Sequence, residues 1–370
     1  MIPQQRILAA INHKPLDRFP LDIGGPVSSI SKIAYDRFLK TYDSSLFPSE
    51  VCDKSQQLAC LHEKFLNKWK VDTRHIRPPF KLKSVSKNSY VDSFGIKRIR
   101  VSSPQYPTLY YEMVDYPLKN STNVDDILDF NWPSFDRQRL DEIRSIARHY
   151  YDQGFAVITD PPAGGILEKP IALCGMEKFF RAIYGNYEFV KTLLEYSSMF
   201  HCHFWEEWLD ELADWVTIAF IGDDYGTQER MMISPKMWRE LVKPHLKDLV
   251  KTIKNAANVK VMLHSCGSIA PIIPDLIEVG IDVLNPVQPA KGMDHQKIKA
   301  SFGDKLCFHG GIDTQEVLPR GSPANVRQEV QRVFNTLGHD GTGYIFAPAH
   351  NILADVFPEN ISALFGWVTK

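Results

Sequence analysis

The chain has 370 residues, which suits one large α/β barrel or two ordinary domains. Its 43 basic and 44 acidic residues give a formal net charge of −1, whereas broad nucleic-acid or anionic-membrane binding needs an excess of Lys and Arg. No apolar run reaches the roughly 20 residues that span a bilayer. The six cysteines show no paired spacing, which is typical of reduced intracellular thiols. We expect a cytoplasmic protein with no nucleic-acid and no membrane partner.

The N-terminal third mixes several kinds of element. Phe19–Ile23 predicts a first strand, and residues 30–41 and 54–69 predict helices. Residues 80–118 look like a β-hairpin insertion, whose Lys and Arg side chains are typical of a solvated edge. Arg139–Tyr150 then predicts a helix that leads back into the main fold.

From Gly154 onward, short apolar runs alternate with helix-length amphipathic stretches. Ser322-Pro323 and Ser234-Pro235 are helix start signals, and Pro244 predicts a kink in the second of these helices. The apolar runs are rich in Val, Ile or Phe, as buried parallel strands are: Phe155–Thr159, Trp215–Ile221, Val259–Leu263, Ile281–Leu284, Leu306–Phe308 and Tyr344–Phe346. We therefore predict a (β/α)8 TIM barrel with an N-terminal helical segment and the hairpin insertion, forming one domain over residues 1–370.

Polar side chains follow each of these strands. An active site on the carboxyl rim of a barrel needs this arrangement. For any single residue, ordinary solvation of a strand end explains it equally well, but six ends together favour a site. The residues are Asp160, Asp223, Asp224, His264, Cys266, Asn285, Gln288, His309, Asp313 and His350.

The sharpest local feature is His264-Ser265-Cys266. Side chains at i and i+2 of a strand share a face, so the imidazole and the thiol can converge on one point. Zn²⁺ accepts such nitrogen and sulfur ligands, and a catalytic zinc site needs three protein ligands. Alone, the pair is more often a hydrogen-bonded histidine beside an inert cysteine.

Two further motifs carry candidate roles. Asp223-Asp224 is a candidate general base or metal-supporting pair, because adjacent carboxylates repel and raise a pKa. Helix-start electrostatics ahead of Ser234 explain the pair as simply. His309 and Asp313 flank Gly310-Gly311 and are candidate substrate ligands, although a tight barrel turn with a satisfied histidine is an equal alternative.

Taken together, the motifs resemble the uroporphyrinogen decarboxylase superfamily, and more closely its branch of cobalamin-dependent methyltransferases. The resemblance runs from Arg18-Phe19-Pro20 nearly to the C-terminus and implies a TIM barrel. It rests on these strings in order: Gly222-Asp223-Asp224-Tyr225-Gly226-Thr227-Gln228, Met232-Ile233-Ser234-Pro235, His264-Ser265-Cys266-Gly267-Ser268, Leu284-Asn285-Pro286-Val287-Gln288, Gly310-Gly311-Ile312-Asp313-Thr314-Gln315 and Ala347-Pro348-Ala349-His350-Asn351.

One N-terminal segment distinguishes between the two activities found in the superfamily, decarboxylation and methyl transfer. True uroporphyrinogen decarboxylases carry an arginine-rich N-terminal segment that grips the carboxylates of the tetrapyrrole. The corresponding stretch here, Phe19 to Asp36, contains no arginine. A substrate with eight carboxylates needs clustered, bidentate cations. The sequence therefore disfavours decarboxylation of that substrate.

The resemblance implies a metal site and a reaction. The methyltransferase branch binds zinc through a His-x-Cys pair and a distant Cys; His264 and Cys266 match the pair, and His350 occupies the distant position. One thiolate instead of two leaves the zinc centre formally +1, which makes it a stronger Lewis acid toward an oxygen leaving group. We hypothesise methyl transfer from an O-methyl or related small donor to a corrinoid protein, which brings the cobalamin in trans.

The resemblance also implies roles for the other rim residues. Asp223 and Asp224 are the expected catalytic pair, as proton donor, orienter or fourth metal ligand. The expected substrate-binding residues are Asp160, Tyr225, Asn285, Gln288, His309 and Asp313. Two alternatives stay open: decarboxylation of a porphyrinogen, and a non-catalytic barrel that binds a small ligand or a corrinoid protein. A homodimer is the default assembly.

Overall fold

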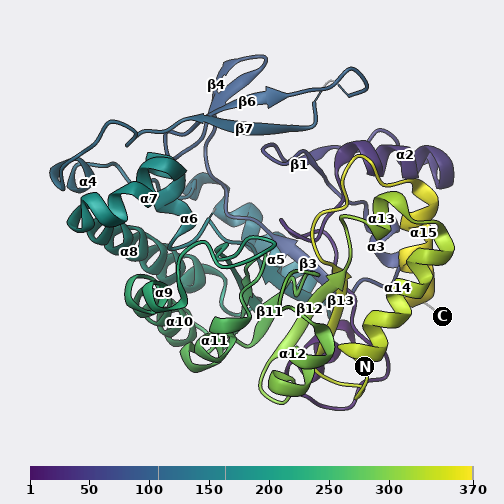
Figure 1. Ribbon diagram of the computed structural model, residues 1–370. Coiled ribbons are helices and arrows are strands. Elements are labelled where there is room, and N and C mark those ends of the chain that lie inside the picture. Colours follow the sequence, from purple (N-terminus) through teal and green to yellow (C-terminus); the bar gives the residue numbers. More distant parts are fainter. Residues whose placement is uncertain (107, 163, 369–370) are drawn as a thin grey trace.

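Seven parallel strands form one curved sheet at the centre of the molecule (Figure 1). The computed structural model describes residues 1–106, 108–162 and 164–368. The order across the sheet is β13-β12-β11-β10-β9-β8-β3, so neighbours in space are also successive strands of the barrel. The strands are β3 (Thr73–Ile76), β8 (Ala156–Thr159), β9 (Ile218–Gly222), β10 (Lys260–His264), β11 (Val283–Asn285), β12 (Cys307–Ile312) and β13 (Tyr344–Pro348).

A short N-terminal segment closes this sheet into a barrel. Leu21 forms a parallel bridge with Phe346 of β13. On its other side, its carbonyl accepts a hydrogen bond from the backbone N–H of Asp72, directly before β3. The segment around Leu21 thus takes the place of the eighth strand between β13 and β3. This is the Phe19–Ile23 strand that the sequence predicts, and the barrel class is confirmed.

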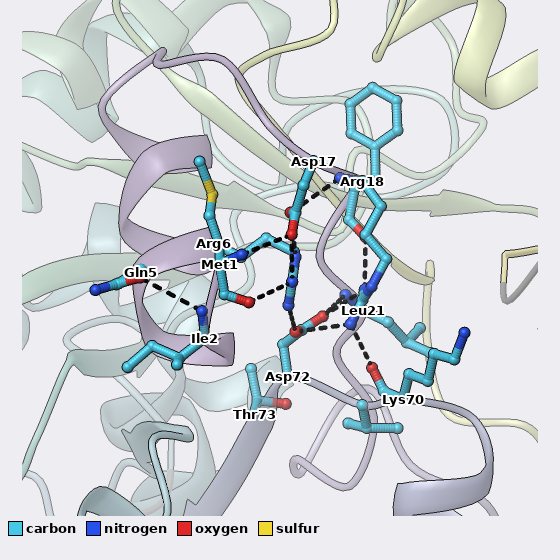
Figure 2. A network of polar contacts seen from close by, with 12 residues as sticks. Met1, Ile2, Gln5, Arg6, Asp17, Arg18, Leu21, Lys70, Asp72 and Thr73 are labelled. Atoms are coloured by element: carbon cyan, nitrogen blue, oxygen red, sulfur yellow. Dashed lines mark hydrogen bonds and ion pairs between the residues drawn. The ribbon is translucent and has the colours of Figure 1, made fainter.

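Buried charges hold that closure together, as Figure 2 shows. The side chain of Asp72 is fully buried and accepts hydrogen bonds from the backbone N–H of Leu21 and from two guanidinium groups. Arg6 Nη1 lies 2.5 Å from Asp72 Oδ1, and Arg18 binds both oxygens at 2.8 and 2.9 Å. The network therefore links the N-terminal helix, the closing segment and the start of β3.

Helices surround the barrel and precede it. Helix α1 has its buried face, including Ile7 and Ile11, against the barrel interior at the amino ends of the strands. The helices are α1 (Pro3–Ile11), α2 (Lys32–Tyr42), α3 (Glu63–Lys68), α4 (Asp125–Leu128), α5 (Leu140–Asp152), α6 (Glu168–Cys174), α7 (Met176–Gly185), α8 (Tyr187–Leu212), α9 (Pro235–Leu241), α10 (Lys243–Ala256), α11 (Ile273–Val279), α12 (His295–Phe302), α13 (Val317–Arg320), α14 (Pro323–Thr336) and α15 (Pro358–Val368), with 3-10 turns at Ser44–Leu46, Arg137–Arg139 and Ala270–Ile272.

The helix signals in the sequence act as expected. Ser322 caps α14, and Ser234 caps α9 by accepting a hydrogen bond from the backbone N–H of Met237. The chain breaks at Val242 between α9 and α10, two residues before Pro244, because proline cannot donate the helical hydrogen bond. The predicted kink is confirmed.

Two expectations for the N-terminal third need correction. Residues 54–69 are helical only in α3, because residues 51–59 form a small antiparallel pair, β1 (Val51–Asp53) with β2 (Leu58–Ala59). The insertion lies where the sequence predicts it, but it contains four antiparallel strands instead of two (top of Figure 1). They are β4 (Lys83–Ser86), β5 (Ser89–Val91), β6 (Lys97–Val101) and β7 (Tyr110–Asp115). That residues 1–370 form one domain stays a prediction.

The strand alternation sorts the core into two layers. Residues that point outward, such as Val261 and Leu263 of β10, pack against the helices. Residues that point inward form a separate apolar cluster inside the barrel: Ala156, Ile158, Ile218, Phe220, Met262, Val283, Cys307 and Ile345, closed from below by α1. Because side chains repeat every two residues, the next inward positions toward the carboxyl ends fall at the mouth of the barrel.

Candidate metal centre

A polar layer lies directly above the apolar barrel interior. Two residues beyond Met262, Val283 and Cys307 come His264, Asn285 and His309, which are 5%, 0% and 1% exposed. Asp160 follows Ile158 in the same way, and Asp22 occupies the inward position of the closing segment. Buried polar side chains need hydrogen-bond partners, and here they find them in one another.

Three of the predicted residues converge in this layer. His264 ends β10, Cys266 follows it, and His350 follows β13. One ligand atom from each of the three lies within 4.8 Å of the others. Cys266 Sγ is 3.3 Å from His264 Nε2. In a tetrahedral zinc site with bonds of about 2.0–2.3 Å, ligand atoms lie about 3.3–3.8 Å apart. The three atoms therefore fit a zinc ion after a small contraction.

The surroundings hold these groups in different protonation states. Burial, together with the charge of His264, lowers the pKa of His350 to about 4. A neutral imidazole at physiological pH has the lone pair that a metal needs. Burial raises the pKa of the Cys266 thiol, and the charge of Asp224 adds to this effect. Without a cation the site therefore keeps its sulfur protonated, and a bound metal would displace that proton.

Two adjacent carboxyl groups follow β9, near the triad formed by His264, Cys266 and His350. Asp224 Oδ1 is 3.5 Å from His264 Nε2 and accepts a 2.7 Å hydrogen bond from the backbone N–H of Cys266. Asp223 is buried and accepts from the backbone N–H groups of Leu167 and Glu168 at the start of α6, at 2.9 and 2.8 Å. Asp224 thus contacts the triad, while Asp223 accepts hydrogen bonds at the start of α6.

Burial raises the pKa of two carboxyl groups, those of Asp223 and Glu168. The pKa of Asp223 is raised to about 7 by burial, against the lowering effect of the backbone donors at Leu167 and Glu168. Burial and the charges of Asp224 and Asp223 raise the pKa of Glu168 to about 8. Protonated carboxyl groups are therefore present next to the triad at neutral pH, which is the requirement for a general acid.

A chain of hydrogen bonds extends from His264 across the barrel. His264 Nδ1 is 2.5 Å from Asn285 Oδ1, and Asn285 Nδ2 is 2.6 Å from His309 Nδ1. His309 Nε2 is 2.9 Å from Asp22 Oδ2. The other oxygen of Asp22 accepts from His75 Nε2 at 2.9 Å. The chain thus joins five barrel segments: β10, β11, β12, the closing segment and β3.

Comparisons with known proteins identify the family. Residues 143–370, more than half of the chain, match the family model described as uroporphyrinogen decarboxylase (URO-D). The chain belongs to the uroporphyrinogen decarboxylase family. A uroporphyrinogen decarboxylase of Pelodictyon phaeoclathratiforme is 27% identical over 143 residues, and that of Chlorobaculum tepidum is 26% identical over 140 residues. Each match covers 37% of this chain and 38% of the relative, so the chain aligns with little more than a third of their length.

A solved structure has a fold similar to that of this chain. A methyltransferase from Methanosarcina mazei superposes with a TM-score of 0.65 over 100% of this chain and 98% of its own, at 15% sequence identity. At this identity the likeness concerns the fold. Among the described residues, no helix is both long and apolar enough to cross a membrane.

Three of the predicted substrate-binding residues contact other residues of the protein. Asp160 Oδ1 lies 2.8 Å from His75 Nδ1, and its other oxygen accepts from Arg77 Nε at 3.0 Å. Asp313 Oδ1 accepts from the backbone N–H groups of Gln315 and Glu316 and so caps a turn. Tyr225 is fully buried, with its ring 5.3 Å from that of Trp238. Contact of these residues with substrate stays a prediction.

The remaining candidates lie on both sides of the glycine pair. Gly310 has a φ of +105°, and a Cβ there would lie 2.5 Å from the carbonyl oxygen of Pro286. The absence of a side chain therefore lets β12 approach the end of β11, which brings His309 to Asn285. Gln288 is half-buried beyond β11. His309 and Asn285 make polar contacts with the protein itself, and contact of His309, Asn285 or Gln288 with substrate stays a prediction.

Sequence reasoning missed five residues of this polar layer and its surroundings. Asp22 comes from the closing segment, Thr73 and His75 come from β3, Arg77 directly follows β3, and Glu168 begins α6. Asp22 lies inside the predicted strand Phe19–Ile23, so the rule that polar residues follow strand ends does not select it; the available signal was a single acidic residue between the apolar Leu21 and Ile23. β3 has no such signal, because Asp72-Thr73-Arg74-His75 interrupts any apolar run.

Proposed function

We propose that this member of the uroporphyrinogen decarboxylase family is a zinc-dependent methyltransferase. It moves a methyl group from an O-methyl ether or related small donor to the cobalt of a separate corrinoid protein. The observation that supports this most strongly is the convergence of His264, Cys266 and His350 within 4.8 Å at the mouth of the barrel. A nitrogen, nitrogen and sulfur set with an open fourth position is typical of catalytic zinc.

The three ligands set the charge of the site. With one thiolate from Cys266 and neutral imidazoles from His264 and His350, a zinc ion would keep a formal charge of +1. When bound, zinc would polarise the leaving oxygen of the donor as a Lewis acid. A residual positive charge suits an oxygen leaving group better than the neutral site that two thiolates would produce.

The carboxyl groups supply the proton that the reaction requires. The methyl group leaves the donor oxygen and bonds to the reduced cobalt, which provides the electron pair, so the oxygen needs one proton. Asp224 is the carboxyl group in contact with the triad, and we assign proton delivery to it. Asp223 and Glu168 hold protons near neutral pH and resupply it.

The named activity of the curated relatives is the second candidate, and the arginines argue against it. Arg18 and Arg37 flank the arginine-free stretch from Phe19 to Asp36, but both are engaged in the fold. Arg18 binds Asp72, and Arg37 donates to the carbonyl oxygens of Ala354 and Val356. An octa-carboxylate would thus meet few available bidentate cations here.

Reconstitution distinguishes the two activities. The zinc-loaded protein is incubated with a panel of aryl and alkyl methyl ethers and a reduced corrinoid protein, and the corrinoid absorbance reports methylation. In parallel, release of CO₂ from a porphyrinogen is measured. We expect methylation with wild type and with Cys202→Ser, a thiol of α8, and its loss with Cys266→Ser. CO₂ release without methylation would replace the proposal by the decarboxylase activity.

A further inference from the structure

In the chain of hydrogen bonds from Asp22 to His264, each group determines whether the next one donates or accepts. Asp22 is fully buried and accepts hydrogen bonds from four side chains. They are Ser28 Oγ at 2.8 Å, Thr73 Oγ1, His75 Nε2 at 2.9 Å and His309 Nε2 at 2.9 Å. Burial alone would raise the pKa of Asp22, but His75 and His309 together hold it well below its ordinary value. Asp22 is therefore an ionised carboxylate that only accepts hydrogen bonds.

An acceptor at this end decides the tautomer of the next group. Because Asp22 accepts, His309 must carry its proton on Nε2. The Nδ1 of a neutral His309 is then an acceptor, and it lies 2.6 Å from Asn285 Nδ2, which can only donate. The carboxylate thus fixes both the tautomer of His309 and the orientation of the Asn285 amide.

The same reasoning reaches the metal ligand. With its Nδ2 toward His309, Asn285 presents Oδ1 to His264 Nδ1 at 2.5 Å. An amide oxygen only accepts, so His264 carries its proton on Nδ1. Its Nε2 is left with a lone pair that faces Cys266 Sγ at 3.3 Å, with Asp224 Oδ1 3.5 Å from the same nitrogen. A metal-ligating histidine needs this arrangement, in which the distal nitrogen is anchored by an acceptor.

On the far side, a second histidine keeps Asp22 in place. His75 lies between two carboxylates, with Nε2 2.9 Å from Asp22 and Nδ1 2.8 Å from Asp160. The charges of both acids, together with these hydrogen bonds, outweigh burial and raise the pKa of His75 to about 10. His75 is therefore an imidazolium that donates to both acids. Arg77 Nε completes the row by donating to Asp160 at 3.0 Å.

We propose that Asp22 is a positioning residue for the metal centre: acting through His309 and Asn285, it holds His264 in the Nδ1–H tautomer that presents Nε2 to the cation. In this role Asp22 acts on His264 only through His309 and Asn285. The inference rests on the proposed zinc function, but the tautomer exists in the metal-free protein and can be observed there.

The test uses ¹⁵N-histidine NMR of the full-length, metal-free protein at neutral pH. Nitrogen shifts distinguish the Nδ1–H from the Nε2–H tautomer, and the His264 signals are assigned by their loss in His264→Gln. Wild type is expected to show His264 with its proton on Nδ1. His309→Phe leaves every atom that touches His264 intact but frees the Asn285 amide to rotate, so we expect a mixture of tautomers.

Two substitutions at position 285 refine the test. Asn285→Asp keeps an acceptor toward His264 Nδ1, so the tautomer and the zinc affinity are expected to persist. Asn285→Leu removes the acceptor, and the zinc affinity measured by competition with a chromophoric chelator is expected to fall about 10- to 100-fold, as it does when such anchors are lost elsewhere. Circular dichroism and thermal unfolding establish that each variant is folded. The matched control is His201→Phe, which removes a buried histidine of α8 that takes no part in the hydrogen bonds between Asp22 and His264.

The outcomes separate this inference from the proposed function. A wild-type His264 with its proton on Nε2, or a His309→Phe variant with unchanged tautomer and unchanged zinc affinity, would overturn the role of Asp22. If the tautomer responds as expected but the wild type binds no zinc, the inference about the chain holds and the proposed function fails.

Discussion

The imidazole rings of His264 and His350 meet edge to face at the barrel mouth, with centroids 5.8 Å apart and planes inclined by 63°. His264 ends β10 and His350 follows β13, and these strands are not neighbours, because β11 and β12 separate them in the sheet. Only a curved, closing sheet brings the ends of these strands together. The barrel is therefore the reason that a histidine near the C-terminus can join the His-x-Cys pair.

Replacing one of these rings tests the charge argument. His350→Cys adds a second thiolate, so the formal charge of a zinc site falls from +1 to 0. We expect zinc to bind more tightly and methyl transfer from an O-methyl donor to slow by tenfold or more, which corresponds to about 1.4 kcal/mol of lost transition-state stabilisation. Chelator competition and the initial rate measure the two effects. A faster variant would contradict the proposed role of the residual charge.

Neutralising Asp224 tests the assignment of the proton donor. Asp224→Asn keeps the shape of the side chain but cannot transfer a proton, so we expect the methyl-transfer rate to fall by about 10²- to 10⁴-fold. Zinc content, measured by atomic emission, should stay that of wild type. Asp214→Asn, at an exposed position after α8, provides the control. Loss of zinc in Asp224→Asn would instead make this residue the fourth ligand.

The closure of the barrel predicts a large stability effect. Asp72→Ala leaves Arg6, which is 7% exposed on its side chain, and Arg18 without their shared carboxylate. Breaking a buried ion pair in this way costs about 3–5 kcal/mol of unfolding free energy. Urea denaturation at neutral pH measures the difference. Asp17→Ala removes a 41% exposed partner of Arg6 and is expected to cost much less. Equal effects would show that the buried position of Asp72 has no special weight.

His201 on α8 predicts a pH dependence of stability. Burial, together with the charge of Lys169, lowers its pKa to about 3, from an ordinary value of 6.5. Below pH 6.5 the unfolded chain therefore binds a proton that the folded chain excludes, and stability falls as the pH falls toward 3. At about 1.4 kcal/mol per pH unit once the unfolded histidine is fully protonated, the loss between pH 6.5 and 4.5 is about 2 kcal/mol.

Denaturation series at several pH values measure this slope in wild type and in His201→Phe. The variant cannot take up the proton, so its stability should change less over the same range. An identical slope in both proteins would assign the acid sensitivity to other groups, such as His350, whose pKa is also lowered, to about 4.

The sequence predicts the second half of the barrel well, because each strand there is a short apolar run with a polar end. The run Val259–Leu263 and the motif His264-Ser265-Cys266 locate β10 and two of the converging residues, and the family resemblance adds His350. Period-two alternation then explains why His264, Asn285 and His309 share one layer.

The first half of the barrel could not be predicted in the same way. β3 carries Thr73, Arg74 and His75 in place of an apolar run, since its inward side chains belong to the polar layer around Asp22. Their partners are distant in the chain, and no local spacing encodes such contacts. The direction of the hydrogen-bond chain likewise needs atomic positions, because it follows from which nitrogen or oxygen faces which neighbour.

The zinc content of the purified protein tests the central claim most directly. Cells are grown with added zinc, and the metal is measured by atomic emission, with X-ray absorption to identify the ligands. We predict stoichiometric zinc bound by one sulfur and by histidine nitrogen in wild type and in Cys202→Ser, and loss of that zinc in Cys266→Ser. A wild-type protein that neither contains zinc nor takes it up when titrated, or a Cys266→Ser variant with the same zinc content as wild type, would contradict the account.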